Sequence, residues 1–196
     1  ALAQFIQRYG PTGELHGAIG HDLGLYGPRG LAIDNQDNLY VVDTGNNRIV
    51  KLSPAGQLLA QFGGQGSGPG QLDQPTDVAV DAAGRMYVAD TYNLRLQVLD
   101  SAGRYLREWS ISGANTFDSP HLQVGPGGQV FITDPEAHVV VAYDGAGHVL
   151  GQWGGFGAAA GQFHKPIGLA FDGAGRIYVT DAYNHRVQVF ELRSPE

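Results

Sequence analysis

The chain has 196 residues, a formal net charge of −7 and lysine only at Lys51 and Lys165. General affinity for nucleic acid normally needs a basic patch, so this charge disfavours nucleic acid as a partner. The absence of cysteine excludes disulfides and thiolate metal sites. No apolar run approaches the roughly 20 residues of a membrane span.

The sequence repeats itself at an interval of about 46 residues, and each unit holds several short apolar runs, which is typical of a β-propeller. The markers are a proline after each connector and an aspartate at the end of the second run: Pro28, Pro75, Pro120 and Pro166, with Asp43, Asp90, Asp134 and Asp181. We therefore expect an all-β propeller of four-stranded antiparallel blades over residues 1–196, with about four blades.

In chain order, residues 1–20 are predicted to form the third and fourth strands of a partial blade. Residues 28–64 and 75–110 form full blades, residues 120–155 a divergent blade, and residues 166–192 a blade without its fourth strand. The sequence leaves two arrangements of the blades undecided. Either the strand Leu15–Ile19 completes the last blade of a small ring, or the chain is an arc of a larger ring. An arc would favour self-association or attachment to a larger chain, because its ends expose strand edges.

Short turns and a column of large apolar residues complete each unit. Glycine comes late in the hairpin loops, as in Ala83-Gly84 and Ala102-Gly103, where a left-handed backbone is needed. Six residues after each turn between the third and fourth strands stands a bulky side chain that we expect to pack between blades: Ile19, Phe62, Trp109 and Trp153.

The loop after the second strand carries the most specific motif, Asp-x-x-Asn-x-Arg. It reads Asp43-Thr44-Gly45-Asn46-Asn47-Arg48 in the first full unit and recurs in the next and the last. With the preceding Tyr-Val and the Gly-Gln-Leu or Gly-Gln-Phe before the proline, the chain resembles the NHL repeat family. The resemblance implies a propeller and covers nearly the whole chain. The third unit departs from it, because Asp134-Pro135-Glu136-Ala137-His138-Val139 keeps only the aspartate.

We assign these motif residues to structure, because Asp and Asn accept backbone N–H bonds and Arg reaches the carboxylate. The structural set is Asp43, Asn46, Arg48, Asp90, Asn93, Arg95, Asp134, Asp181, Asn184 and Arg186.

Residues directly after the repeat proline are expected at the mouth of the central channel, in a ring of Arg29, Thr76, His121 and Ile167. The resemblance implies one metal hypothesis, because some amidating lyases with this repeat hold zinc by channel histidines. Here His121 and His164 are the candidates. No histidine recurs at the inward position, and the Asp34–Asn38 loop does not fit the helix–loop–helix calcium spacing. No catalytic residue, metal or cofactor is expected, with zinc and calcium as the alternatives.

The sequence favours a non-catalytic binding or scaffold module that recognises a protein, peptide or glycan through loops at the channel mouth. From the family resemblance we expect a bacterial, extracytoplasmic protein. The alternatives are a metal-dependent lyase or hydrolase with its site in the channel, and an RNA-binding propeller face that uses Arg29, Arg48 and Arg95. The predicted binding residues are Arg29, Asp77, Tyr92, His121, His138, His164, Lys165 and Tyr183.

Overall fold

The computed structural model describes residues 4–111 and 120–192. Its regular elements are antiparallel β-strands and four 3-10 turns, and the sheets are arranged radially as propeller blades. The predicted all-β propeller fold is therefore confirmed. Among the described residues, no helix is long or apolar enough to cross a membrane.

An N-terminal hairpin comes first. It consists of β1 (Ile6–Tyr9) and β2 (Leu15–Ile19), which pair only with each other, and the 3-10 turn η1 (His21–Leu23) follows. The hairpin packs on the face of the first blade through Ile6 and Ile19.

Three four-stranded blades and one three-stranded blade follow the hairpin. The first blade is β3 (Pro28–Ile33), β4 (Leu39–Asp43), β5 (Arg48–Leu52) and β6 (Leu58–Gly63). The second is β7 (Pro75–Val80), β8 (Met86–Asp90), β9 (Arg95–Leu99) and β10 (Tyr105–Ser110). The third is β11 (Leu122–Val124), β12 (Val130–Asp134), β13 (Val139–Tyr143) and β14 (Val149–Gly154). The fourth is β15 (Pro166–Phe171), β16 (Arg176–Asp181) and β17 (Arg186–Glu191).

Short 3-10 turns join the second strand to the third in the first, second and fourth blades. They are η2 (Thr44–Asn46), η3 (Thr91–Asn93) and η4 (Ala182–Asn184). A residue with a left-handed backbone follows each turn, for example Asn47 at φ 54° and Leu94 at φ 53°.

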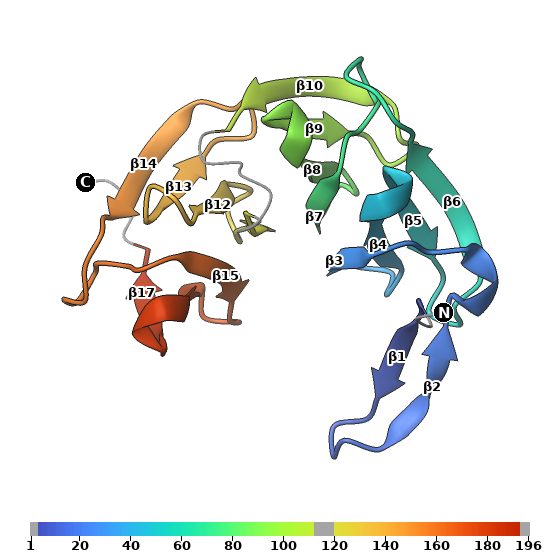
Figure 1. The fold of residues 1–196 in the computed structure, drawn as a ribbon, viewed down its shortest axis with the longest axis horizontal. Coiled ribbons are helices and arrows are strands. Elements are labelled where there is room, and N and C mark those ends of the chain that lie inside the picture. The colour runs from blue at the N-terminus through green and yellow to red at the C-terminus, as the bar shows by residue number, and fades with distance from the viewer. Residues whose placement is uncertain (1–3, 112–119, 193–196) are drawn as a thin grey trace.

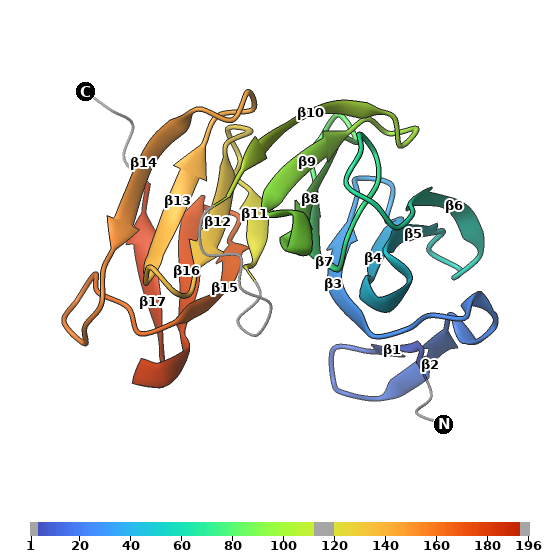
Figure 2. The ribbon, with the colours of Figure 1, turned by 45° about the horizontal axis from the view of Figure 1, so that its top comes forward.

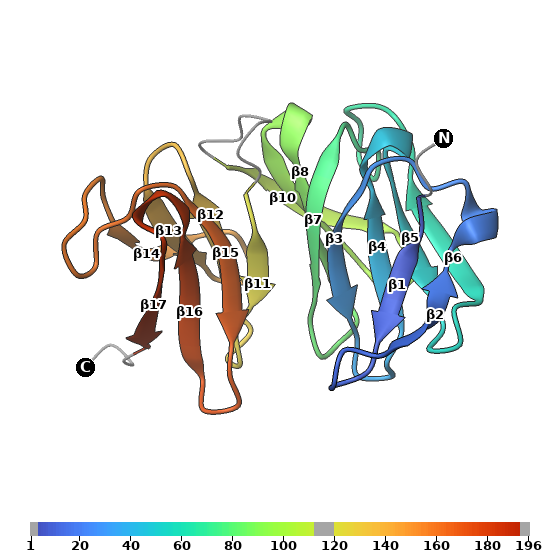
Figure 3. The same ribbon diagram turned by 60° about the horizontal axis from the view of Figure 1, so that its bottom comes forward.

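The first strands of the four blades lie side by side around the centre, in the order β3, β7, β11 and β15 (Figure 3). The third and fourth strands lie toward the outside, so the blades fan out from the inner strands (Figures 1 and 2). The fan does not close. Among the described residues β17 pairs only with β16, and Figure 1 shows an open space between the fourth blade and the hairpin. The small-ring alternative, in which Leu15–Ile19 completes the last blade, is wrong, and the chain forms an arc.

The core lies between blades rather than within one sheet. At the junction of the second and third blades, Leu96 and Val98 of β9 are buried with Val130 and Ile132 of β12. Because each strand alternates its side chains between two faces, the second and third blades each bury one face against the blade before and the other face against the blade after.

The predicted apolar column packs between blades. Ile19 contacts the turn glycine Gly56, Phe62 lies against Gly103, and Trp109 lies against Gly147, so the bulky residue of one blade covers the hairpin turn of the next. Gly103 and Gly147 have φ of 79° and 95°, a backbone that favours glycine.

Candidate functional site

The loops after the second strands and the starts of the inner strands share one face of the arc, here called the loop face. In the second blade, Pro75 of β7 pairs with Asp90 at the end of β8. The N–H of Asp73 donates to Asp90 Oδ1 at 2.7 Å, and the N–H of Tyr92 donates to the Asp73 carbonyl at 3.1 Å. The motif aspartate therefore ties the loop to the beginning of the inner strand.

Each complete motif forms a closed network around a fully buried carboxylate. Asp90 Oδ2 accepts hydrogen bonds from Asn93 Nδ2 at 2.9 Å and from Arg95 Nε at 2.8 Å. The equivalent arginine–aspartate bonds, Arg48 to Asp43 and Arg186 to Asp181, are both 2.7 Å. The arginines also donate to connector carbonyls, which holds the connector against its blade.

The third blade keeps the aspartate without its usual partners. Asp134 Oδ1 accepts the N–H groups of Glu136 and Ala137 at 3.1 and 2.9 Å. Its other oxygen is buried and has no hydrogen-bond partner among the residues that the structure describes. Ala137 and Val139 stand where the other blades have asparagine and arginine, which accounts for the missing donors.

An aspartate–histidine pair links the inner strands of the second and third blades. Asp77 Oδ2 lies 3.3 Å from His121 Nδ1 and accepts the N–H of Leu122 at 2.9 Å. Asp77 is buried, whereas about half of the His121 side chain is exposed. The hydrogen bond that the His121 imidazole donates to the Asp77 carboxylate raises the pKa of His121 above its usual 6.5, and desolvation opposes this rise.

The register of the third blade corrects the predicted channel ring. Asp77 and Gly168 pair with Ala89 and Thr180, the residues just before the motif aspartates. In the third blade, the residue just before the motif aspartate is Thr133, and His121 exchanges hydrogen bonds with it. His121 is therefore equivalent to Asp77 and Gly168, not to Thr76 and Ile167, because Pro120 comes one residue later in its repeat.

The most distinctive feature of the loop face is a group of four rings at the junction of the third and fourth blades. We call His138, Phe156, His164 and Tyr183 the aromatic cluster. The His164 centroid lies 5.0 Å from both Phe156 and Tyr183, and 5.6 Å from His138. The Lys165 ammonium lies 5.5 Å from the Tyr183 centroid. Phe156 and Tyr183 are 67% and 58% exposed, so the cluster presents apolar surface to solvent.

Different segments supply the cluster. His138 ends the loop before β13, Phe156 lies in the glycine-rich connector after β14, and His164 precedes β15. Tyr183 lies in η4. The sequence singled out three of the four rings and missed Phe156. Its signal is an aromatic residue in Gly155-Phe156-Gly157, where the equivalent connector has Gly64-Gln65-Gly66.

The other predicted binding residues lie apart from this cluster. Arg29 is at the start of β3, Tyr92 is on the second blade, and Asp77 and His121 form the pair described above. Of the two candidate metal ligands, His121 contacts Asp77, whereas His164 belongs to the aromatic cluster. Among the described residues, no group of three or more histidines or carboxylates is arranged to hold a metal ion.

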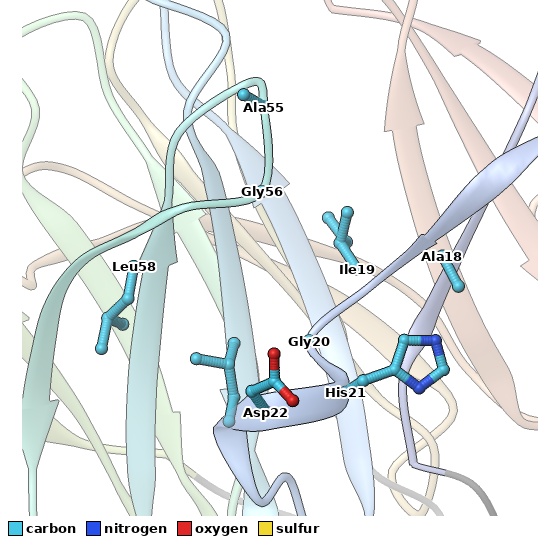
Figure 4. A pocket seen from close by; sticks show the side chains of 9 residues that line it. Ala18, Ile19, Gly20, His21, Asp22, Ala55, Gly56 and Leu58 are labelled. Atoms are coloured by element: carbon cyan, nitrogen blue, oxygen red, sulfur yellow. The ribbon is translucent and has the colours of Figure 1, made fainter.

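A hollow of about 380 Å³ lies where β2 and η1 meet the hairpin turn of the first blade (Figure 4). Ile19 and Gly56 on its wall are the contact pair of the apolar column. His21 stacks on the Phe5 ring with centroids 4.4 Å apart. The hollow therefore lies over inter-blade packing and holds no cluster of chemically active side chains.

Comparison with known proteins agrees with this architecture. The NHL repeat model matches residues 25–52, 72–99 and 163–190, which cover parts of the first, second and fourth blades and leave out the divergent third. A B-box type zinc finger protein, ncl-1, of Caenorhabditis elegans is 50% identical over 40 residues, which is 20% of this chain and 5% of that protein.

Solved structures share the fold at low sequence identity. A streptogramin B lyase superposes with a TM-score of 0.69 and 14% identity, over 98% of this chain and 63% of the lyase chain. A catalytically inactive virginiamycin B lyase from Staphylococcus aureus, solved with quinupristin, gives 0.66 and 13%, over 98% and 64%. A chain of a nidogen/laminin complex gives 0.68 and 20%, over 90% and 66%. This chain thus spans less than two thirds of the length of the lyases. From its three matched repeats and its radial antiparallel sheets, the chain carries NHL repeats in a β-propeller fold.

Proposed function

We propose that this chain is a non-catalytic binding module that recognises a protein, peptide or glycan through the loop face. The observation that carries the proposal is the aromatic cluster. Phe156 and Tyr183 expose more than half of their surface, whereas Tyr40, Tyr87 and Phe163 are fully buried. Exposed aromatic groups on loops held by a rigid scaffold mark recognition sites, because they supply contact area with little loss of side-chain entropy.

The chain itself contains a comparison that supports a role in binding. The junction of the first and second blades has the same backbone pattern, yet it lacks the aromatic cluster. The counterparts of His138, Phe156, His164, Lys165 and Tyr183 are Asn47, Gln65, Asp73, Gln74 and Tyr92. Since both junctions fold alike, the fold does not require the extra rings at the junction of the third and fourth blades.

Neither alternative finds comparable support in the site geometry. A metal-dependent lyase or hydrolase needs converging ligands, and the described residues offer no such group. This alternative would be ruled out if metal analysis of the purified chain detected neither zinc nor calcium. An RNA-binding face would use Arg29, Arg48 and Arg95, and two of these, Arg48 and Arg95, form salt bridges with Asp43 and Asp90. The extracytoplasmic location stays a prediction.

The test is to present the 196-residue chain to arrays of peptides and glycans. We expect binding to one of these classes that is lost in the Phe156→Ala/Tyr183→Ala double variant. Tyr9→Ala is the control, because Tyr9 is an aromatic residue on β1 of the N-terminal hairpin and is 57% exposed. Absence of binding on both arrays, or equal loss in the double variant and the Tyr9 control, would contradict the proposal.

A further inference from the structure

We propose that the aromatic cluster binds a proline-rich peptide segment in the polyproline II conformation. This inference rests on the proposed function and names its ligand class. Aromatic surfaces recognise such segments because the ligand is already extended and loses little entropy on binding.

The first argument is the orientation of the rings. His164 is nearly perpendicular to both Phe156 and His138, at 81° and 79°, and is tilted by 36° from Tyr183. Rings set at such angles do not form one flat platform on which a sugar chain or successive bases could stack. They present both ring faces and ring edges, against which the compact, puckered ring of proline can pack.

The second argument is the spacing. The path from Phe156 through His164 to Tyr183 has two steps of 5.0 Å between centroids. One three-residue turn of polyproline II advances roughly 9 Å. The two exposed ends of the path are therefore at most about 10 Å apart, a separation that can accommodate two prolines one turn apart.

The third argument is the balance of donors and acceptors. His138 Nδ1 accepts the N–H of Lys165 at 3.1 Å, so the neutral ring carries its hydrogen on Nε2 and is a donor there. Tyr183 has a hydroxyl, and the ammonium of Lys165 is a donor only. A run of prolines has no backbone N–H and offers carbonyl acceptors alone. Such a ligand is also uncharged, so the net charge of −7 does not repel it.

The fourth argument separates recognition from folding. In the junction of the first and second blades, Asn47 Oδ1 accepts the N–H of Gln74 at 2.7 Å, the same bond that His138 Nδ1 makes to Lys165. Gln74 and Lys165 both have left-handed backbones, at φ 46° and 59°. An amide side chain thus fulfils the structural task, and the imidazole adds a ring to the site.

The experiment titrates a fluorescein-labelled decaproline peptide with the 196-residue chain and follows fluorescence anisotropy. Decaproline built from D-residues is the matched ligand, because it has the same composition and a helix of opposite hand. Phe156→Gln and His138→Asn install the counterpart residues of the other junction, and the asparagine retains an acceptor for the Lys165 N–H. We expect each to weaken binding of the L-peptide by about tenfold or more, with unchanged thermal unfolding, while Tyr9→Ala on the N-terminal hairpin leaves binding unchanged.

Three results would overturn the inference: no saturable binding of the L-peptide, equal binding of the L- and D-peptides, or unaltered binding by both variants. A second outcome separates the two proposals. If the chain binds a glycan on the array, Tyr183→Ala abolishes that binding and decaproline does not bind, this inference is refuted and the proposed function is supported. Absence of binding to every array ligand and to decaproline would refute both.

Discussion

Single residues on the loop face show how a polar network is made compatible with burial. Asp43, Asp90 and Asp181 are fully buried, and each has an arginine and an asparagine donor on the same oxygen. A buried charge is tolerated when it is paired and hydrogen-bonded, whereas removing one partner leaves the other uncompensated. The contribution of the motif arginine to the stability of the fold should therefore be largest in the blade where its side chain is least exposed.

Replacing Arg95 by methionine tests this expectation. Arg95 is 10% exposed, and its loss leaves Asp90 without its cation. We expect the free energy of unfolding to fall by about 3–5 kcal/mol, the cost of breaking a buried pair. Chemical denaturation monitored by circular dichroism provides the measurement.

The control is Arg104→Met, because the Arg104 side chain is 82% exposed in its pair with Asp100. This variant should keep the denaturation midpoint of the parent chain. Equal midpoints for the Arg95 and Arg104 variants would mean that the motif does not stabilise the blade.

Contacts between strands and turns of neighbouring blades act at the next scale. The column of Ile19, Phe62 and Trp109 covers the turn glycines of the following blades, so a side chain at such a glycine would overlap the covering residue. The pair Asp77–His121 joins two inner strands in a similar way, by a hydrogen bond rather than by packing.

Gly103→Ala and Gly70→Ala separate packing from backbone strain. Both glycines have a left-handed backbone, at φ 79° and 77°. A methyl group at Gly103 would overlap the Phe62 ring, whereas one at Gly70 meets open space. Both variants lose about 1 kcal/mol to backbone strain, and Gly103→Ala should lose about 1–3 kcal/mol more through overpacking. Thermal unfolding that shifts equally in both variants would contradict the packing argument.

The Asp77–His121 pair predicts a pH-dependent link between the second and third blades. The folded-state pKa of His121 is raised above 6.5, so the stabilisation is fully present below that pH and is lost as pH rises through the raised pKa. The difference in Tm between the parent chain and His121→Gln should therefore be larger at about pH 5.5 than at about pH 8.5. The idea fails if that difference is independent of pH or grows with pH.

At the scale of the whole molecule, the open arc leaves one face of the fourth blade uncovered by any other described blade. Val187 and Val189 on β17 are 58% and 50% exposed. Their equivalents on β9, Leu96 and Val98, are 0% and 1% exposed because the third blade covers them. An exposed strand edge beside an apolar face favours association with another chain or segment.

We expect the average mass of the 196-residue chain in analytical ultracentrifugation to rise with concentration. The Val187→Lys/Val189→Lys double variant should remain monomeric over the same range, because charge on the uncovered face opposes association. Val149→Lys is the control, since Val149 is 61% exposed on the outer strand β14. A parent chain whose mass is independent of concentration would argue against an adhesive face.

The sequence by itself determined the period, the strands, the turn glycines and the motif aspartates, because strand alternation and turn chemistry act over a few neighbouring residues. It also singled out His138, His164 and Tyr183. Only the tertiary structure decided that the arc stays open, that Phe156 joins those rings, and that His121 meets Asp77 in a shifted register. These features depend on how separate blades are placed against one another, and no local pattern records the distance between two loops that belong to different sheets.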